Sequence, residues 1–273
     1  MKRSRVPGRI LQALVAVFLY APILVLIVFS FNSDKSRTQF KGFTLDWYVS
    51  LFENQQVLSA LYLSLVIAVL SALIATVIGT AAAIGLYSMK QRPRKMLLSL
   101  NNIPVVNPDI ITGVALMMLF ILCITFLRSL GVRAGLGFTT LLFAHVTFNI
   151  PYVILSVLPK LRQLSKHTYE AALDLGASPF AAYRRVIMPE IMPGITAGAM
   201  IAFTMSIDDF LISYFTTGTS VQTLPMVIYS MTRKRVSPEI NALSTLMFVT
   251  VLALLIAINV LQARDQKKKE QRL

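Results

Sequence analysis

The stretch EAALDLGASPFAAYRRVIMP, Glu170–Pro189, places charges, a glycine and two prolines inside an otherwise apolar chain. Four apolar or small residues just before and within it recur at the i, i+3, i+4 and i+7 spacing of one helix face, namely Tyr169, Ala172, Leu173 and Gly176. Gly176 suits the left-handed position that ends a helix, and Ser178 before Pro179 is typical of an N-cap and first helical residue. The stretch therefore predicts a helix, a sharp corner and a second helix running towards Pro189.

The start of the first helix has two candidate caps, Ser165 and Thr168. Glu170 is then expected in the first turn, where the helix dipole stabilises a carboxylate. One interpretation is an amphipathic helix lying on the inner leaflet, with Arg184 and Arg185 near anionic lipid. The other is a contact surface for a second protein, because the apolar stripe is narrow and rich in alanine. Composition does not separate these two readings.

The composition of the whole chain predicts an all-α integral membrane protein. Of 273 residues, 56% are hydrophobic and only 14% charged, and a bilayer span needs about 20 apolar residues. A single transmembrane domain over residues 1–273 is expected, with the loop 159–190 between spans four and five. The six expected spans are Ile10–Phe31, Leu58–Tyr87, Met96–Leu127, Gly137–Leu158, Ile191–Phe215 and Leu243–Leu261. The first is as long as a span and no small-residue cleavage site follows it, so we expect an uncleaved anchor.

The distribution of basic residues predicts the orientation. Six spans put both termini on one side, and the segments on that side (2–9, 90–95, 160–185 and 264–272) carry 18 of the 26 Lys and Arg residues. By the positive-inside rule, both termini and the Glu170–Pro189 stretch are expected in the cytoplasm.

Several functional classes find no support in the sequence. The net charge of +14 is scattered between apolar runs, so nucleic acid is not an expected partner, whereas membrane lipids are. The lone Cys123 excludes an internal disulfide. Neither a metal-ligand cluster nor a nucleophile with a nearby base is present, so no catalytic or metal site is predicted. No G-x-x-x-x-G-K-[ST] phosphate loop occurs, so this chain is not expected to hydrolyse ATP.

Three acids lie inside apolar windows: Asp109, Asp208 and Asp209. A carboxylate near the bilayer centre costs at least about 2.5–3.5 kcal/mol on insertion scales, so each should face the bundle interior, a cavity or a partner. Counted from the cytoplasmic ends of their windows, Asp109 and Asp208 lie at about the same depth, roughly 20–25 Å. Asp109, Asp208 and Asp209 are therefore candidate contacts for a cationic cargo. One alternative is that Asp109 caps the half-helix after Pro108. Another is that Asp208 or Asp209, as neighbours on one helix, bonds to another span or to a partner subunit, or is protonated.

Two further features concern the spans themselves. The third window contains Pro104 and Pro108, which predicts a kinked or broken helix. The fourth carries a polar stripe of His145, Asn149 and Tyr152, for which interhelical hydrogen bonding is favoured over a role in a pathway.

The predicted helix, corner and helix at residues 165–189, called the elbow below, contain a motif that resembles a known family. Glu170-Ala171-Ala172, Gly176 and Val186-Ile187-Met188-Pro189 resemble the EAA loop of ABC importer permeases, whose pattern is E-A-A, three residues, G, nine residues, I, one residue, L-P. Val186 and Met188 depart from it conservatively. Five segments, spread over nearly the whole chain, are similar to the spermidine/putrescine importer permeases: 107–110, 142–148, 170–189, 203–209 and 236–242.

This resemblance implies a type I ABC importer permease in a bacterial inner membrane, taking up polyamines by alternating access. In such permeases the loop is a coupling helix that docks on a cytoplasmic ATPase, which here assigns that role to Tyr169, Glu170, Ala171, Ala172, Leu173, Gly176 and Pro189. The implied partners are a homologous second permease, two ATPase subunits that bind ATP and Mg, and an extracytoplasmic polyamine-binding protein. No cofactor is expected on this chain itself.

Three alternatives stay open at this point. Related permeases for other small solutes share several of these segments. A stand-alone secondary transporter using the three acids as cation sites would need broken helices in both halves, and only one proline-broken window is present. A membrane-anchored assembly factor without a pathway would leave the acids dispensable.

Overall fold

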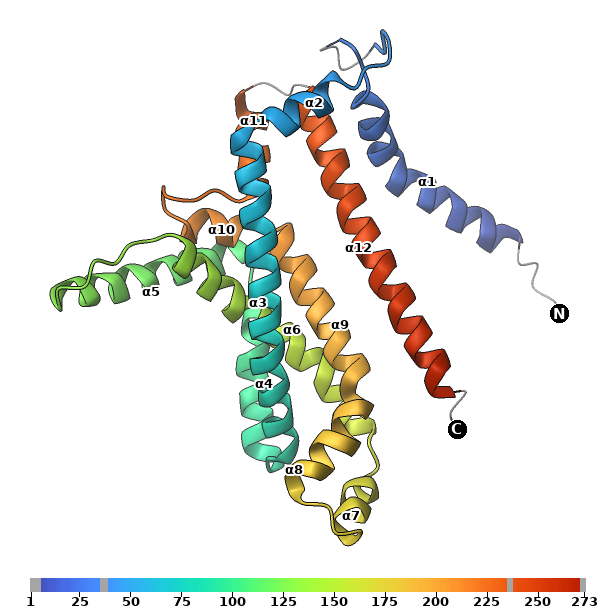
Figure 1. Ribbon diagram of the computed structural model, residues 1–273, viewed down its shortest axis with the longest axis vertical. Helices are drawn as coiled ribbons and strands as arrows, with labels where there is room; N and C mark the ends of the chain where they lie inside the picture. Colours follow the sequence, from blue (N-terminus) through green and yellow to red (C-terminus); the bar gives the residue numbers. More distant parts are fainter. Residues whose placement is uncertain (1–5, 35–38, 235–237, 271–273) are drawn as a thin grey trace. The chain divides into compact units, whose positions relative to one another are not determined.

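The protein is all-helical, as predicted. The computed structural model describes residues 6–34, 39–234 and 238–270, and within them the helices are joined by turns and one isolated bridge between Asn32 and Phe43 (Figure 1). The α-helices are α1 Val6–Phe29, α2 Asp46–Glu53, α3 Gln55–Ser88, α4 Gln91–Val106, α5 Asp109–Ser129, α6 Phe138–Gln163, α7 Lys166–Asp174, α8 Pro179–Ala182, α9 Met188–Ile207, α10 Leu211–Thr216, α11 Leu224–Lys234 and α12 Pro238–Glu270. A π-helical turn, η1, spans Tyr183–Ile187.

Five helical stretches are long and apolar enough to cross a membrane: Leu11–Phe29, Gln55–Ser88, Asp109–Ser129, Phe138–Gln163 and Pro179–Ile207. A shorter apolar stretch, Pro238–Ala253, begins α12. The described residues therefore supply five to six apolar helices, in agreement with a multi-span membrane protein.

The chain forms two compact units, where the sequence analysis treated residues 1–273 as one domain. One unit takes the described residues up to Ser59 together with Val227–Leu261, and holds α1, α2 and most of α12. The other takes Ala60–Met226 together with residues 262–270. All the residues singled out above as candidate site residues lie in this second unit.

The centre of the second unit is the antiparallel pair α6 and α9, which pack closely over most of their length (Figure 1). Glycines make this possible: a Cβ added at Gly194 would lie 2.8 Å from the carbonyl oxygen of Ser156, and one at Gly198 would lie 3.1 Å from the Cα of Val153. Small residues at such crossings are how membrane helices gain close van der Waals contact. The buried core around the pair includes Ala75, Ala83, Val153, Val157, Leu161, Ile191 and Ala202, which come from α3, α6 and α9.

The third predicted span is broken, as its prolines indicated. α4 ends at Val106 and α5 begins at Asp109, with Asn107 in an extended conformation between them. A residue that precedes proline disfavours helical geometry, which explains the break at Asn107 before Pro108. The Asn107 amide also donates to the Thr112 hydroxyl (3.2 Å), across the start of α5.

The fifth predicted span is broken too, which corrects the expectation that only the third was. α9 ends at Ile207 and α10 begins at Leu211, so Asp208 and Asp209 lie in the turn between two helices and not on one helix. Neither proline nor glycine occurs at this break. Its cause is a side chain: the Asp209 carboxylate accepts hydrogen bonds from the backbone N–H groups of Ile212 and Ser213 and caps α10.

Helix α9 continues the second helix of the elbow without interruption. The helix that starts at Pro179 passes through α8 and η1 and ends at Ile207, where the sequence suggested a helix towards Pro189 and a span from Ile191. Pro189 has no N–H, and the π turn before it accommodates this: the N–H of Met188 donates to the carbonyl of Tyr183, five residues back. The elbow is therefore rigidly joined to the span.

Candidate functional site

The elbow, residues 165–189, has the predicted helix, corner and helix. α7 ends in a Schellman motif, in which the N–H of Gly176 donates to Leu173 (2.8 Å) and that of Ala177 to Ala172 (3.1 Å). Gly176 has φ +84°, the left-handed geometry that favours glycine. Ser178 then caps α8, because its hydroxyl accepts from the N–H of Ala181 at 3.3 Å. Each of these local features was predicted from the sequence.

Two details at the start of α7 differ from expectation. Ser165 occupies the N-cap position, but its side chain makes no capping hydrogen bond. Because α7 begins at Lys166, Glu170 falls in the second turn and the first turn holds no acid. Glu170 faces solvent instead, and its carboxylate lies 3.5 Å from the His167 imidazole at the i, i+3 spacing.

One face of α7 holds the elbow against the rest of the second unit. The Tyr169 ring packs on that of Tyr183 with centroids 5.2 Å apart, and both contact the core around Leu161. Ala172 and Leu173, from the predicted stripe, are half-buried, whereas Glu170, Ala171 and Gly176 are exposed. Three of the four stripe residues, Tyr169, Ala172 and Leu173, therefore anchor the elbow inward, and the face that carries Glu170 and Ala171 is exposed.

The corner of the elbow presents two apolar side chains that the sequence analysis missed. Leu175 is 88% exposed and Phe180 is 75% exposed, on either side of Gly176. Leu175 is the C-cap of α7 and Phe180 is the second residue of α8, so both flank the corner. Glu170 and Asp174 are exposed on α7, and Arg184 and Arg185 on η1. The exposed surface is thus an apolar tip between an acidic and a basic side.

A groove with a volume of about 530 Å³ lies beside the elbow, where the turn between α3 and α4 approaches it. It is lined by three tyrosines (Tyr87, Tyr169, Tyr183), three charged residues (Lys90, Arg94, Glu170) and polar and apolar neighbours, among them Gln91, Ser165 and Ile187. The groove places the basic turn after α3 next to the exposed face of α7.

The three acids come together at the two helix breaks. Asp109 is the first residue of α5, and Asp208 is the C-cap of α9; both are exposed in the chain taken alone. Asp208 and Asp209 precede α10, and α10 packs on α5. The two half-helices that follow the breaks meet at Gly113, where an added Cβ would lie 3.3 Å from the carbonyl of Leu211. The chain thus forms an acidic cluster, defined as Asp109, Asp208 and Asp209.

Comparison with known proteins places the chain in a family. Residues 75–270 match the family described as "Binding-protein-dependent transport system inner membrane component". The chain belongs to this family. The permease is 40% identical over 265 residues to the spermidine/putrescine transport system permease protein PotC of Escherichia coli K12, covering 96% of this chain and 97% of PotC. It is 39% identical over 267 residues to the putrescine transport system permease protein PotI of the same strain, covering 97% and 94%.

The fold of the permease is shared with a solved structure. A chain of a bacterial ABC transporter involved in the import of the acidic polysaccharide alginate superposes with a TM-score of 0.77 and 16% identity, covering 95% of each chain. At that identity the likeness concerns the fold alone. The predictions of an ABC importer permease fold and of a multi-pass inner-membrane protein are confirmed, whereas the cytoplasmic placement of both termini stays a prediction.

Two of the three residues in the polar stripe of the permease on α6, His145 and Asn149, make the interhelical bonds that were favoured for it. The amide of Asn149 donates to the hydroxyl of Ser206 on α9 (2.7 Å), and that hydroxyl lies 2.9 Å from that of Ser71 on α3. His145 reaches α10, with Nε2 at 3.1 Å from the Ser213 hydroxyl. Tyr152 is half-buried and stacks edge-on against Phe148 (5.4 Å between centroids).

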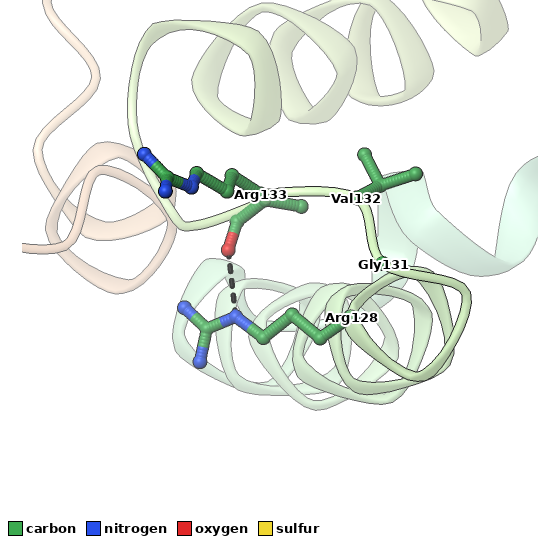
Figure 2. Close-up of a pocket in the computed structure, with 5 residues that line it drawn as sticks. Arg128, Gly131, Val132 and Arg133 are labelled. Atoms are coloured by element: carbon green, nitrogen blue, oxygen red, sulfur yellow. Dashed lines mark hydrogen bonds between the residues drawn. The ribbon is translucent and has the colours of Figure 1, made fainter.

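A second hollow, of about 490 Å³, follows α5 and lies apart from the acidic cluster. It is lined by Arg128, Gly131, Val132, Arg133 and Ala134. Figure 2 shows the Arg128 side chain reaching across it, where its Nε donates to the carbonyl of Ala134 at 2.8 Å. Asp109 and Arg128 are at opposite ends of α5, about 30 Å apart at 1.5 Å per residue. The basic side chains of this turn are therefore too far away to neutralise the acids.

Proposed function

We propose that this permease is one membrane subunit of an ATP-driven importer of polyamines, spermidine or putrescine, working by alternating access. The observation that carries the proposal is the 40% identity, over nearly the full length, to a permease named for spermidine and putrescine. The acidic cluster supports it chemically, because polyamines are chains of ammonium groups and neither broken window contains a basic residue. In this proposal the ammonium groups of the cargo provide the positive charge that balances the carboxylates of the acidic cluster.

The proposed partners follow from the family. A homologous second permease completes the pathway, and an extracytoplasmic binding protein delivers the polyamine, as the family description "binding-protein-dependent" suggests. Two cytoplasmic ATPase subunits bind ATP and Mg, and this chain binds no cofactor of its own. Both termini and the elbow lie in the cytoplasm, in keeping with the excess of basic residues on that side.

The elbow is proposed to be the docking element for one ATPase. Exposed Leu175 and Phe180 favour a protein pocket, since buried aromatic and aliphatic anchors dominate such interfaces. The mixed charge supports this: an anionic leaflet would attract Arg184 and Arg185 but repel Glu170 and Asp174. Because the helix from Pro179 to Ile207 is continuous, movement of the elbow would be transmitted to the break at Asp208.

A stand-alone secondary transporter is the rival mechanism. The second helix break removes one argument against it, because broken helices do occur in both halves of the described chain. This rival mechanism assigns no function to the elbow. The rival predicts polyamine uptake driven by an ion gradient in liposomes that contain no ATPase.

The test is reconstitution of the permease with its partner permease, ATPases and binding protein in liposomes. ATP inside should drive accumulation of spermidine or putrescine, and a non-hydrolysable analogue should not. Uptake of a different solute class under the same conditions would reassign the cargo, and uptake without ATPase would establish the rival. Correct assembly with no uptake of any solute would favour an assembly factor.

A further inference from the structure

Asp209 differs from the other two acids in its surroundings. Its side chain is only 7% exposed, whereas Asp109 and Asp208 are exposed residues. Oδ1 accepts from the N–H of Ile212 (3.2 Å), and Oδ2 accepts from both the N–H (2.7 Å) and the hydroxyl (2.9 Å) of Ser213. The hydrogen-bonding capacity of this carboxylate is largely used within the fold, which leaves little of it for a cargo ammonium group.

The fourth neighbour of the carboxylate is His145 on α6. Its Nε2 lies 3.1 Å from the Ser213 hydroxyl and 3.5 Å from Oδ2 of Asp209, and its side chain is 1% exposed. Because the single hydroxyl hydrogen of Ser213 goes to Asp209, the imidazole must donate from Nε2. The tautomer with a hydrogen on Nε2 leaves only an acceptor at Nδ1, which has no hydrogen-bond partner among the described residues.

We propose that His145, Asp209 and Ser213 form a latch that fixes the broken half-helix α10 on α6, and that Asp209 is a positioning residue and not a cargo contact. The latch holds the turn in which Asp208 lies, so Asp209 acts on cargo only through Asp208. The transport test of this inference rests on the proposed function, because it measures polyamine uptake. The Asp209 carboxylate would then set the break, and replacing it with an amide would loosen α10.

The two half-helices that meet at Gly113 support the distinction. α5 begins at Asp109 with Pro108 at its N-cap, and Asp109 is exposed. α10 is capped by Asp209, one residue before its N-cap position. Two acids at neighbouring helix starts therefore have different tasks: Asp109 remains available to solvent, and Asp209 is committed to backbone donors.

The test compares charge-removing variants in the complete reconstituted transporter, with spermidine and putrescine as cargoes. Asp208→Asn should raise the KM for spermidine by about tenfold or more, the loss expected for a charged hydrogen bond, and should shift the preference between the two cargoes. Asp209→Asn and His145→Leu should lower the maximal uptake rate for both cargoes and leave the preference unchanged. His145→Gln, which keeps a donor near Nε2, should restore most of the rate.

The latch also predicts that variants of its residues affect stability in a non-additive way, which can be measured without cargo. In melting experiments on the purified complex, the losses of Tm from Asp209→Asn and His145→Leu should be less than additive in the double variant. Ser213→Ala serves as the second variant where Asp209→Asn does not assemble, and should be coupled to His145→Leu in the same way. Asp208→Asn should not be coupled to His145→Leu.

Two outcomes would overturn the latch: a change of cargo preference in Asp209→Asn as large as in Asp208→Asn, or strictly additive Tm losses. Failure of the wild-type complex to take up polyamines would overturn the proposed function instead, and the melting experiments would still decide on the latch.

Discussion

Gly194 of α9 lies against the backbone of Ser156 in α6, so close that an added Cβ would be 2.8 Å from the Ser156 carbonyl oxygen. The same Cβ would be 3.3 Å from the Cα of Val157. Backbone atoms cannot move aside as a flexible side chain can. The pairing of α6 with α9, which carries the elbow at one end and the acidic cluster at the other, therefore depends on this glycine.

Gly194→Ala should force the two helices apart and destabilise the permease by about 1–3 kcal/mol, as overpacking does. Gly85→Ala is the matched control, because a Cβ on Gly85 of α3 meets no atom within 4 Å. The measurement is the Tm of the purified protein in detergent. Equal Tm values for the two variants would contradict the packing assigned to Gly194.

Gly176→Val should uncouple transport from ATP hydrolysis. A β-branched residue at φ +84° is strained by about 1–2 kcal/mol, which disrupts the Schellman motif and the angle of the corner. Gly176→Asn is the control, since asparagine tolerates left-handed geometry. ATP-driven uptake and ATPase association should be lost in the valine variant and largely kept in the asparagine variant. Intact uptake in Gly176→Val would argue against a rigid elbow.

Leu175→Ser and Phe180→Ser should weaken association with the ATPase and leave the fold intact, because both side chains are mostly exposed. Truncating such an anchor typically reduces affinity by about 1–4 kcal/mol. Val132→Ser, an exposed apolar residue in the turn after α5, is the control. Co-purification of the ATPase reports the effect, and an unchanged yield in the double variant would remove these residues from the docking surface.

Asn149→Ala tests whether the buried polar stripe is structural. Hydrogen bonds between membrane helices contribute about 0.6 kcal/mol on average and up to about 1.7 kcal/mol, so a modest loss of Tm with substantial residual uptake is expected. Ser71→Ala, which removes another hydroxyl of the same network, should behave similarly. Full stability combined with abolished uptake would instead indicate a role in the pathway.

Local sequence signals were sufficient for the elbow and for the break at Pro108. Glycine and proline act through backbone geometry, and a capping serine acts through a hydrogen bond to a nearby backbone N–H. The effects of Gly176, Ser178 and Pro108 are therefore local and follow from residue type. The six apolar windows likewise follow from bilayer thickness.

The break at Asp208 could not be predicted in this way. Neither proline nor glycine marks it, and the low helix propensity of two aspartates is too weak a signal to end a span. The break depends on the Asp209 carboxylate capping α10 and on His145, 64 residues earlier in the chain, lying beside it. That juxtaposition exists only once α6 and α10 have packed. The exposure of Leu175 and Phe180 also depends on the tertiary structure. The i, i+3, i+4 and i+7 pattern uses residue spacing alone and carries no information about the corner between α7 and α8.

Crosslinking from the elbow tests the central claim most directly. Cys123 is the only cysteine, so Cys123→Ser followed by Ala171→Cys gives a single reactive site on the exposed face of α7 and leaves Leu175 and Phe180 in place. In inner-membrane vesicles that contain the whole transporter, we expect this cysteine to crosslink to the ATPase subunit, with a yield that changes on addition of ATP. Reaction only with lipid-phase reagents, and no ATPase adduct with or without ATP, would contradict the account.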